Sequence, residues 1–459
     1  MRLNLPAMTF GAVLLPASMV LIAFTGVASG ETMTLDQALA AAYDTNTQLQ
    51  AQRAALRATD EDVATAISGW RPTVTANANY GYTRDETSPP NFAAIAPSGH
   101  PRDVGVTLTQ PLFNGTTIPQ TRQAKAGVDA GRAPLISVEQ TTLLNAANAY
   151  FDVLANESQL TYKRRNAARL TEQVQMAQQR AAIRDIARSD LQLVQARLAS
   201  AQADVAAAEA NLASARAAFL RTVGRSAGTL DASPQLPALP ATEDDAMAVA
   251  LAGNPDLVAA RYLMNQADAA LTVAYGALAP NLSLQLQYRD TKDELGPGVR
   301  DSSLSATAQL RVPLYQSGTE YAQIRRSVEL RSKAVMQAAD EERVVRQSVD
   351  AAWQTLVGAR SAVALNREQV QSADAAYEGI VAGLRAGERT TFDVLNAETD
   401  LDSAQVALVQ SERQYRGMTF QVLAAIGGLT ASAMKLPVTF YDPIIHYERD
   451  TGSWFGTGN

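Results

Sequence analysis

The sequence predicts a mainly helical protein that is built from two copies of one unit, with a pair of β-strands in each copy. Three observations support this prediction. Landmark residues of the first half recur in the same order in the second half. Hydrophobic residues make up 47% of the chain but aromatic residues only 6%, which favours long helices rich in Ala and Leu. Short segments in each half alternate apolar and polar residues, which is the pattern of strands.

The repeat accounts for nearly the whole chain after its first thirty residues. Matching residues lie 208 positions apart at first and 202 or 203 apart later, so the first copy has the longer intervening loop. The matching pairs are Asn46/Asn254, Leu49/Leu257, Pro72/Pro280, Pro111/Pro313, Asp190/Asp393 and Gly224/Gly427. We therefore expect a first unit at residues 31–224, a Pro-rich linker at 225–242, a second unit at 243–428 and a C-terminal tail at 429–459.

Residues 1–30 have the features of a secretory signal peptide. Arg2 precedes an apolar stretch from Met8 to Val27, and small residues around Ala28 offer a cleavage site. A membrane anchor is the alternative, but Pro16 interrupts the apolar stretch. No later segment has about 18 uninterrupted apolar residues, so we expect an exported chain without a membrane-spanning helix.

Strands are expected at about residues 71–84, 102–113, 280–290 and 303–314. In the first, apolar or aromatic residues from Val74 to Tyr82 alternate with polar residues or glycine. Four strands of about ten residues with one apolar face suit a membrane β-barrel with lipid outside and water inside. An ordinary sheet with one buried face is the alternative. Because four strands cannot close a barrel, the barrel requires several chains.

The helical segments have a second, longer periodicity. Residues 116–183 form one helical pattern, which at 1.5 Å per residue is about 100 Å long, and Pro134 should kink it. Shorter helices at 35–69 and 189–224 together match that length and could flank it end to end. Residues seven apart repeat in both copies and predict left-handed coiled-coil packing. The large positions are Leu191, Leu198, Val205, Leu212 and Phe219, matched by Val394, Leu401, Leu408, Tyr415 and Val422. The intervening positions are Val194, Ala201, Ala208 and Ala215, matched by Ala397, Ala404, Ser411 and Met418.

The composition argues against several classes of function. The chain has no cysteine and two histidines, which leaves no thiolate nucleophile and no histidine metal cluster. His100 and His446 are each expected to stand alone on the surface, so no metal or cofactor site is predicted. A net charge of −7 and a pI near 5.1 argue against nucleic-acid binding. No nucleophile–base arrangement is recognisable, so an enzyme is not expected.

Several motifs in a fixed order resemble the TolC family of outer-membrane efflux and secretion channels. They are LDQALA at 35–40, TQPLFNG at 109–115, VPLYQSG at 312–318 and GERTTFDVLNA at 387–397. Pro111, Gly115, Pro313 and Gly318 lie in the expected strand-to-helix turns. The resemblance covers essentially residues 31–428. It implies a homotrimer whose twelve strands form an outer-membrane β-barrel, continued by a periplasmic α-helical coiled-coil barrel.

The resemblance also implies a function. The trimer would be the exit duct of a tripartite efflux pump, a type I secretion system or both, in the outer membrane of a Gram-negative bacterium. Its partners would be outer-membrane lipid, a periplasmic adaptor (membrane fusion) protein and an inner-membrane transporter of the resistance-nodulation-division, ABC or major-facilitator type. The alternative is a periplasmic coiled-coil adaptor or scaffold that forms no pore.

The family pattern places a gate at the periplasmic turns between long and short helices. An ion pair between Arg389 and Asp190 would lock the resting state, and a threefold ring of Asp393 would form the constriction. The plainer alternatives are that both aspartates are N-caps and that Arg389 is a solvated loop charge. Adaptors would dock on the turn residues Ile183, Arg184 and Asp185 and on Ala386, Gly387 and Glu388.

Three residues depart from the family pattern. Asn396 replaces the second constriction aspartate, which should weaken blocking of the pore by cations. Leu384 replaces a tyrosine that is often found before the glycine, so one hydrogen bond is lost. Arg184 stands where a glycine is usual, which bears on the choice of adaptor.

Overall fold

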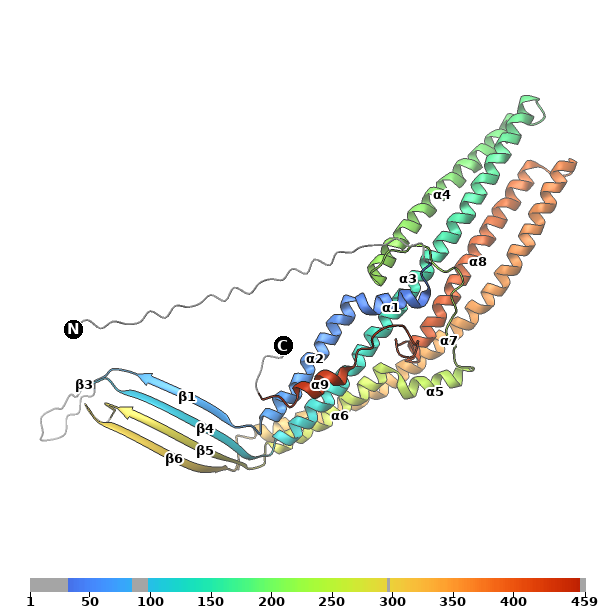
Figure 1. The fold of residues 1–459 in the computed structure, drawn as a ribbon. Coiled ribbons are helices and arrows are strands. Elements are labelled where there is room, and N and C mark those ends of the chain that lie inside the picture. Colours follow the sequence, from blue (N-terminus) through green and yellow to red (C-terminus); the bar gives the residue numbers. More distant parts are fainter. Residues whose placement is uncertain (1–31, 85–97, 295–297, 455–459) are drawn as a thin grey trace, which may run out of the picture.

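Long antiparallel helices form an elongated body with one β-sheet at its end (Figure 1). The computed structural model describes residues 32–84, 98–294 and 298–454. The predicted signal peptide lies outside these residues. Across the described ranges, we find no helix that is both long enough and apolar enough to span a membrane.

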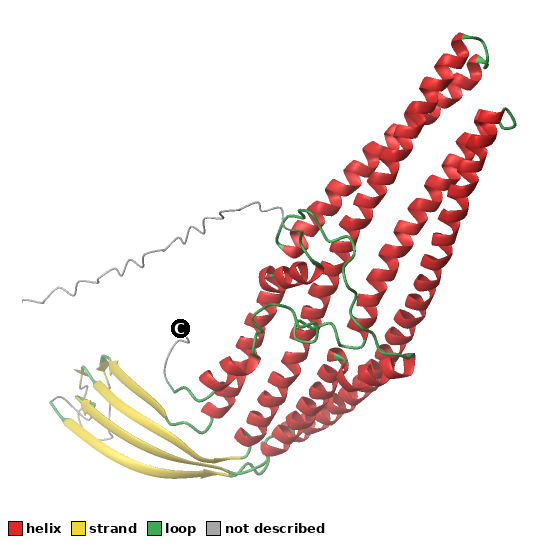
Figure 2. Ribbon diagram, turned by 45° about the vertical axis from the view of Figure 1, so that its right-hand side comes forward, coloured by secondary structure: helices red, strands yellow, loops and turns green. Residues whose placement is uncertain are grey.

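Each copy contributes two main strands and a long helical hairpin, as predicted, and a pair of short helices where one helix was expected (Figure 2). The helices of the first copy are α1 (Leu35–Thr45), α2 (Thr47–Ser68), α3 (Thr117–Ala182) and α4 (Arg188–Val223). Those of the second are α5 (Glu243–Gly253), α6 (Pro255–Gly276), α7 (Thr319–Ala386) and α8 (Thr391–Ala425). The strands are β1 (Thr73–Tyr80), β4 (Arg102–Asn114), β5 (Asn281–Lys292) and β6 (Arg300–Arg311), with a small extension by β2 (Thr83–Arg84) and β3 (Ser98–Gly99). In the tail, α9 spans Pro443–Asp450.

The prediction of one continuous helix at 35–69 was wrong. The helix breaks at Asn46, whose side chain accepts hydrogen bonds from the backbone N–H groups of Gln48 and Leu49 at 2.9 and 3.0 Å. Asn254 caps α6 in the same way in the second copy. An asparagine cap offers these N–H groups a local partner, which favours an end over continuation. The long helix, in contrast, continues through Pro134.

The short helices stack end to end along the long ones, as expected. The end of α4 meets the end of α1, where the Thr45 hydroxyl donates to the Val223 carbonyl at 3.1 Å. Gly224 has a φ of +76° there, and a Cβ would lie 2.4 Å from the Thr45 hydroxyl oxygen. In the second copy the Asn254 side chain donates to the Ala425 carbonyl at 2.9 Å. Both joints therefore depend on the same kind of close approach.

The predicted heptad positions form the interface of the hairpins. Every one of them is buried or half-buried, and Phe219, Val194, Val422 and Ala404 are fully enclosed. The largest buried side chains, Tyr150, Phe151, Phe219 and Phe420, pack where α3 crosses α4 and α8. The aromatic residues thus fill this part of the core, while the smaller side chains at the intervening heptad positions let the helices approach closely.

The main sheet has the strand order β1-β4-β5-β6, and all neighbours are antiparallel. The register aligns the alternating residues: Val74 faces Leu108, which faces Leu286, and Thr75 faces Thr107, which faces Gln287. Along most of the strands one face is therefore apolar, and the other carries Thr, Ser, Asn and Gln together with the ion pair of Asp103 and Arg289. The apolar face ends in charged residues such as Arg102 and Asp290 beyond Tyr288. The predicted strand 303–314 instead ends at Arg311, before Pro313, which has no N–H to donate.

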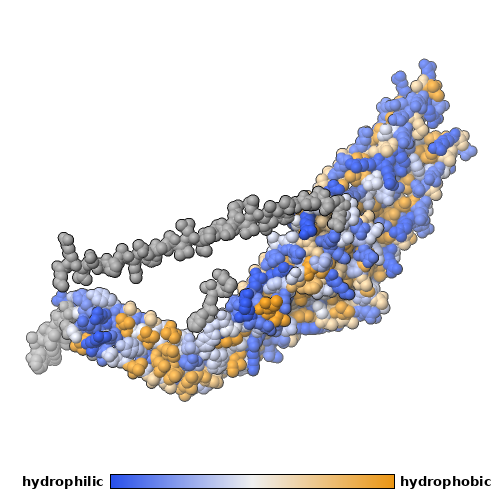
Figure 3. Space-filling model, in the orientation of Figure 1, coloured by the Kyte–Doolittle hydropathy of each residue, from blue (hydrophilic) through white to orange (hydrophobic). Residues whose placement is uncertain are grey.

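The apolar face of the sheet is uncovered. Leu304 is 80% exposed, Tyr80 76% and Val74 64%. Figure 3 shows hydrophobic side chains gathered over this end of the molecule. A face of this kind does not persist in water without a covering layer.

The first strand-to-helix turn lies against the start of the second sheet half. A Cβ on Gly115 would lie 2.3 Å from the Cβ of Ala279 and 2.6 Å from the Gly276 carbonyl oxygen. Gly115 is therefore needed for close packing between the copies. Gly318 instead supplies a left-handed backbone, with a φ of +79° just before α7. The matching turns thus use glycine for different reasons.

Candidate functional site

The two hairpins end in turns that share one backbone geometry. At the second tip the Gly387 N–H donates to the Leu384 carbonyl at 3.1 Å, and the Glu388 N–H donates to the Gly383 carbonyl at 2.9 Å. Gly387 has a φ of +79°, as helix ends of this type require. Ala386 is the last residue of α7 and is exposed beside it.

The first tip reproduces this turn without a glycine. The Arg184 and Asp185 N–H groups donate to the Ala181 and Arg180 carbonyls at 3.1 and 2.9 Å. Arg184 has a φ of +58°, which costs a residue with a Cβ about 1–2 kcal/mol. The Arg180 side chain pairs with Asp185 at 2.7 Å across the same turn. Ile183 is 77% exposed, so this tip presents an apolar residue between charges.

The plainer alternative, that Asp393 is an N-cap, is wrong. Thr390 is the cap of α8, and Asp393 is the third helical residue. Its carboxylate accepts hydrogen bonds from the Thr390 N–H at 2.9 Å and the Thr390 hydroxyl at 2.8 Å, which completes a capping box. These hydrogen bonds, with a smaller contribution from Arg389, lower the pKa of Asp393. The side chain therefore carries its negative charge at neutral pH.

Asp190 is not an N-cap either. It is the third residue of α4, whose cap position is Ala187, and no side chain caps this helix. Among the described residues, its carboxylate accepts one side-chain hydrogen bond, from the Ser189 hydroxyl at 3.4 Å. The carboxylate is exposed and free to meet a group from outside the hairpin.

Arg389, Asp393 and Asn396 lie together in a groove between α7 and α8. Arg389 packs its aliphatic stem over Gly383, where a Cβ would lie 2.7 Å away. Among the described residues of one chain, Arg389 forms no ion pair with Asp190. The two tips end apart from each other (Figure 1). The Arg389–Asp190 lock thus remains a prediction for contact between protomers.

Three ion pairs along the line where α3 packs on α8 were not predicted. Arg413 pairs with Asp152 at 2.6 Å, Lys163 with Asp402 at 2.7 Å and Arg169 with Glu398 at 3.0 Å. Residue numbers rise on α3 as they fall on α8, so the pairs lie in antiparallel register. They link the hairpin of one copy to that of the other.

The Glu398 pair is the most enclosed of the three. Its side chain is 2% exposed and also accepts a hydrogen bond from Gln173 at 2.9 Å. Burial raises the pKa of Glu398, and Arg169 opposes that rise. Nothing in the local pattern indicates these pairs, since the partners lie more than 200 residues apart.

The expectation that His446 stands alone was wrong. Its ring nitrogens lie 3.1 Å from carboxylate oxygens of Asp60 and Asp450. His100 is exposed, as expected, but its ring stacks on Tyr80 with centroids 5.9 Å apart and lies 5.4 Å from Tyr82.

Replacing Arg184 with glycine should stabilise the first tip. Glycine adopts the left-handed conformation without the Cβ penalty, so we expect the free energy of unfolding to rise by about 1 kcal/mol. Chemical unfolding followed by circular dichroism measures this change. The matched variant Gly387→Ala should lower stability by a similar amount. If Arg184→Gly lowered the free energy of unfolding instead, the left-handed backbone at Arg184 would not be what limits the stability of the first tip.

The sequence matches the family described as outer membrane efflux protein over residues 38–225 and 247–428, one segment for each predicted unit. The outer membrane efflux protein BepC of Brucella suis is 33% identical, and the alignment covers 92% of this chain and 91% of BepC. The alkaline protease secretion protein AprF of Pseudomonas aeruginosa is 26% identical over 68% of this chain and 66% of its own length.

Solved structures share the fold. The CmeC outer membrane channel of Campylobacter jejuni superimposes with a TM-score of 0.76 at 16% identity, over 98% of each chain. That likeness supports the arrangement of paired strands and long helical hairpins. Because the family match spans most of the sequence, the chain belongs to the outer membrane efflux protein family.

Proposed function

We propose that this protein is an outer-membrane exit duct that works in efflux, type I secretion or both. The observation that carries the proposal is the unfinished sheet. Among the strands that the structure describes, its edge strands β1 and β6 each pair on one side only, and its apolar face is exposed. Unpaired backbone groups cannot lie in lipid, so closing the sheet requires further chains.

Three copies would supply twelve strands. Pairing β6 of one chain with β1 of the next would close a barrel with the apolar face toward lipid. The polar face would then line a water-filled lumen. It runs across the sheet from Thr75 through Thr107 and Gln287 to Ser305. The α3–α4 and α7–α8 hairpins would continue this lumen as a helical tube in the periplasm.

The tips are the proposed sites of gating and of adaptor docking. Asp393, fixed by its capping box, would form a ring of three carboxylates, and Arg389 would meet Asp190 of a neighbouring chain. The exposed turns 183–185 and 386–388 would contact a periplasmic adaptor, which couples the duct to an inner-membrane transporter. That transporter would supply the energy.

The cargo class stays open between small molecules and proteins. Relatives include a protein named for efflux and one named for secretion of a protease. The residues of the face proposed to line the lumen are mostly small and polar, with the Asp103–Arg289 ion pair among them, and this chemistry suits both.

Closure between chains can be tested by disulfide cross-linking, since the chain has no cysteine of its own. Thr75→Cys would be combined in separate variants with Ser303→Cys, Ser305→Cys or Thr307→Cys. Within one chain these strands are three spacings apart, about 14 Å, which is too far for a disulfide. We therefore expect oxidised dimers and trimers from at least one combination. Thr75→Cys with Gln287→Cys is the matched control, because β5 already has neighbours on both sides. Monomers from all three combinations would contradict closure.

Removing the charge of Asp393 should reduce block of the channel by multivalent cations. Asp393→Asn keeps an acceptor for the Thr390 N–H but abolishes the ring of negative charge. Single-channel recordings in planar bilayers should show weaker block, and Asn396→Asp should show stronger block. Thr390→Ala is the control that disturbs the cap and keeps the charge. If block were unchanged in Asp393→Asn, the ring would lie elsewhere.

A further inference from the structure

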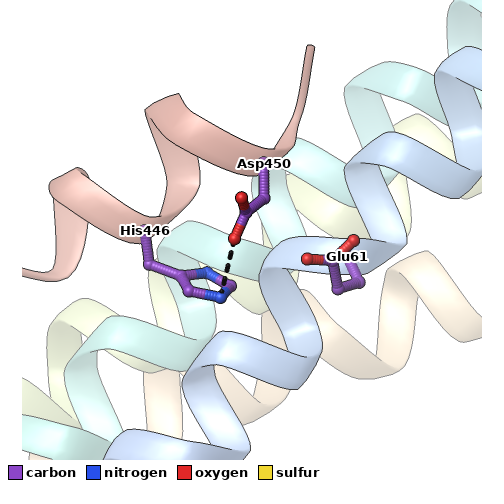
Figure 4. A group of neighbouring side chains, drawn as sticks. All are labelled: Glu61, His446 and Asp450. Carbon is purple, nitrogen blue, oxygen red and sulfur yellow. Dashed lines mark ion pairs between the residues drawn. The ribbon is translucent and has the colours of Figure 1, made fainter. Parts of the chain in front are cut away.

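The C-terminal helix α9 places a histidine between carboxylates of its own and those of α2 (Figure 4). His446 Nδ1 lies 3.1 Å from Asp60 Oδ2, and His446 Nε2 lies 3.1 Å from Asp450 Oδ2. Glu61 follows Asp60 on α2 and points toward the same ring. Within the described ranges, Glu61, His446 and Asp450 are the group whose ligand atoms all lie within 4.8 Å of one another.

Asp60 fixes the orientation of the imidazole ring. Its side chain is 2% exposed, and its Oδ1 is buried without a hydrogen-bond partner. With Asp60 accepting from Nδ1–H, a neutral ring presents its Nε2 lone pair to Asp450. A carboxylate behind one ring nitrogen and a ligand position at the other is the usual arrangement of a metal-binding histidine.

With the ring neutral, the cluster therefore concentrates a nitrogen lone pair and the carboxylates of Glu61 and Asp450, of which Asp450 also pairs with Arg449. The Nε2–Oδ2 separation of 3.1 Å is close to the ligand–ligand edge of a tetrahedral zinc site, about 3.4 Å from Zn–N and Zn–O lengths near 2.1 Å. Glu61 is exposed, so rotation of its side chain can bring its carboxylate to the same distance. Imidazole with carboxylates suits zinc and its neighbours among the divalent transition metals.

We propose that Glu61, His446 and Asp450 bind a divalent transition metal ion of the zinc type, with Asp60 as the positioning residue. The ion would fasten α9 to α2 and so hold the C-terminal segment against the helical body. The earlier part of the tail is anchored by buried residues such as Leu429 and Leu436. From α9 onward the contacts are more exposed, such as Arg132 over the Tyr447 ring at 5.5 Å and Arg71 over the Trp454 ring at 5.0 Å.

Arg449 competes for one of the ligands. Its Nε and Nη2 donate to the two oxygens of Asp450 at 2.9 and 2.8 Å. The side chain is 63% exposed, so it can swing into solvent when an ion arrives. Removing Arg449 therefore distinguishes the two possible roles of the cluster. A metal ion would bind more tightly without a competitor for Asp450, whereas a set of ion pairs would be weakened by the loss of one member.

Calorimetric titration of the purified full-length mature protein with Zn²⁺ alone tests the proposal. We expect one ion per chain, and His446→Gln should weaken binding at least tenfold. His100→Gln is the matched control, since the chain has two histidines and no cysteine, and it should bind like the wild type. Asp60→Asn should weaken binding by about 10–100-fold, because the ring loses its charged support.

Two further measurements decide between a metal site and a cluster of ion pairs. Arg449→Gln should bind Zn²⁺ more tightly than the wild type. Zn²⁺ should also slow proteolysis of the C-terminal segment in the wild type and leave the rate in His446→Gln unchanged. Zn²⁺ binding that survives His446→Gln, or that weakens in Arg449→Gln, would overturn the proposal. Absence of Zn²⁺ binding by the wild type would also overturn the proposal. The cluster would then be an imidazolium that bridges two carboxylates.

Discussion

The free outer edges of β1 and β6, within the residues that the structure describes, constrain the rest of the architecture. The four strands pair with one another in sequence, and their register places most apolar residues on one face. A sheet with two open edges and one uncovered apolar face is unstable alone in water, and its edges are unacceptable in lipid. Both problems disappear together if identical chains close the sheet into a ring. The strands thus call for further chains independently of function, and three copies is the number that we propose.

The two hairpins of the helical body are joined along one line, where α3 packs on α8. Heptad packing holds α3 to α4 and α7 to α8, and α3 meets α8 through three ion pairs as well as apolar contacts such as Phe151 with Phe420. The Arg413–Asp152 pair is partly exposed and can break at modest cost, whereas Glu398 is buried and its pair is costly to break. Movement of one hairpin relative to the other at the tips would therefore be resisted by the aromatic contact and by the Glu398 pair.

Local patterns predicted much of this fold. Period-two and heptad spacing located the main strands and the hairpins, and duplication paired the turns, because these features are set by residues close in sequence. The Thr390–Asp393 capping box also has a local signature, a threonine followed three residues later by an acid. The N-cap alternative for Asp393 placed the cap of α8 three residues too late. The break at Asn46 was missed because the helical period continues across it.

Other features depend on contacts that no local pattern records. Asp60 and His446 lie 386 residues apart, so the cluster on α9 could not be seen from spacing. The α3–α8 ion pairs are equally distant. The Arg389–Asp190 contact is not formed within one chain, and its test requires neighbouring protomers. Sequence thus predicted the elements and the tip turns better than it predicted the interactions between them.

The most direct measurement of the central claim is the single-channel current of the mature protein in a lipid bilayer, with the mass of the same detergent preparation determined by light scattering. We expect a trimer that inserts into the bilayer and gives a small, cation-selective conductance. A chain that stays soluble, monomeric and non-conducting would contradict closure of the sheet and would favour a periplasmic coiled-coil adaptor.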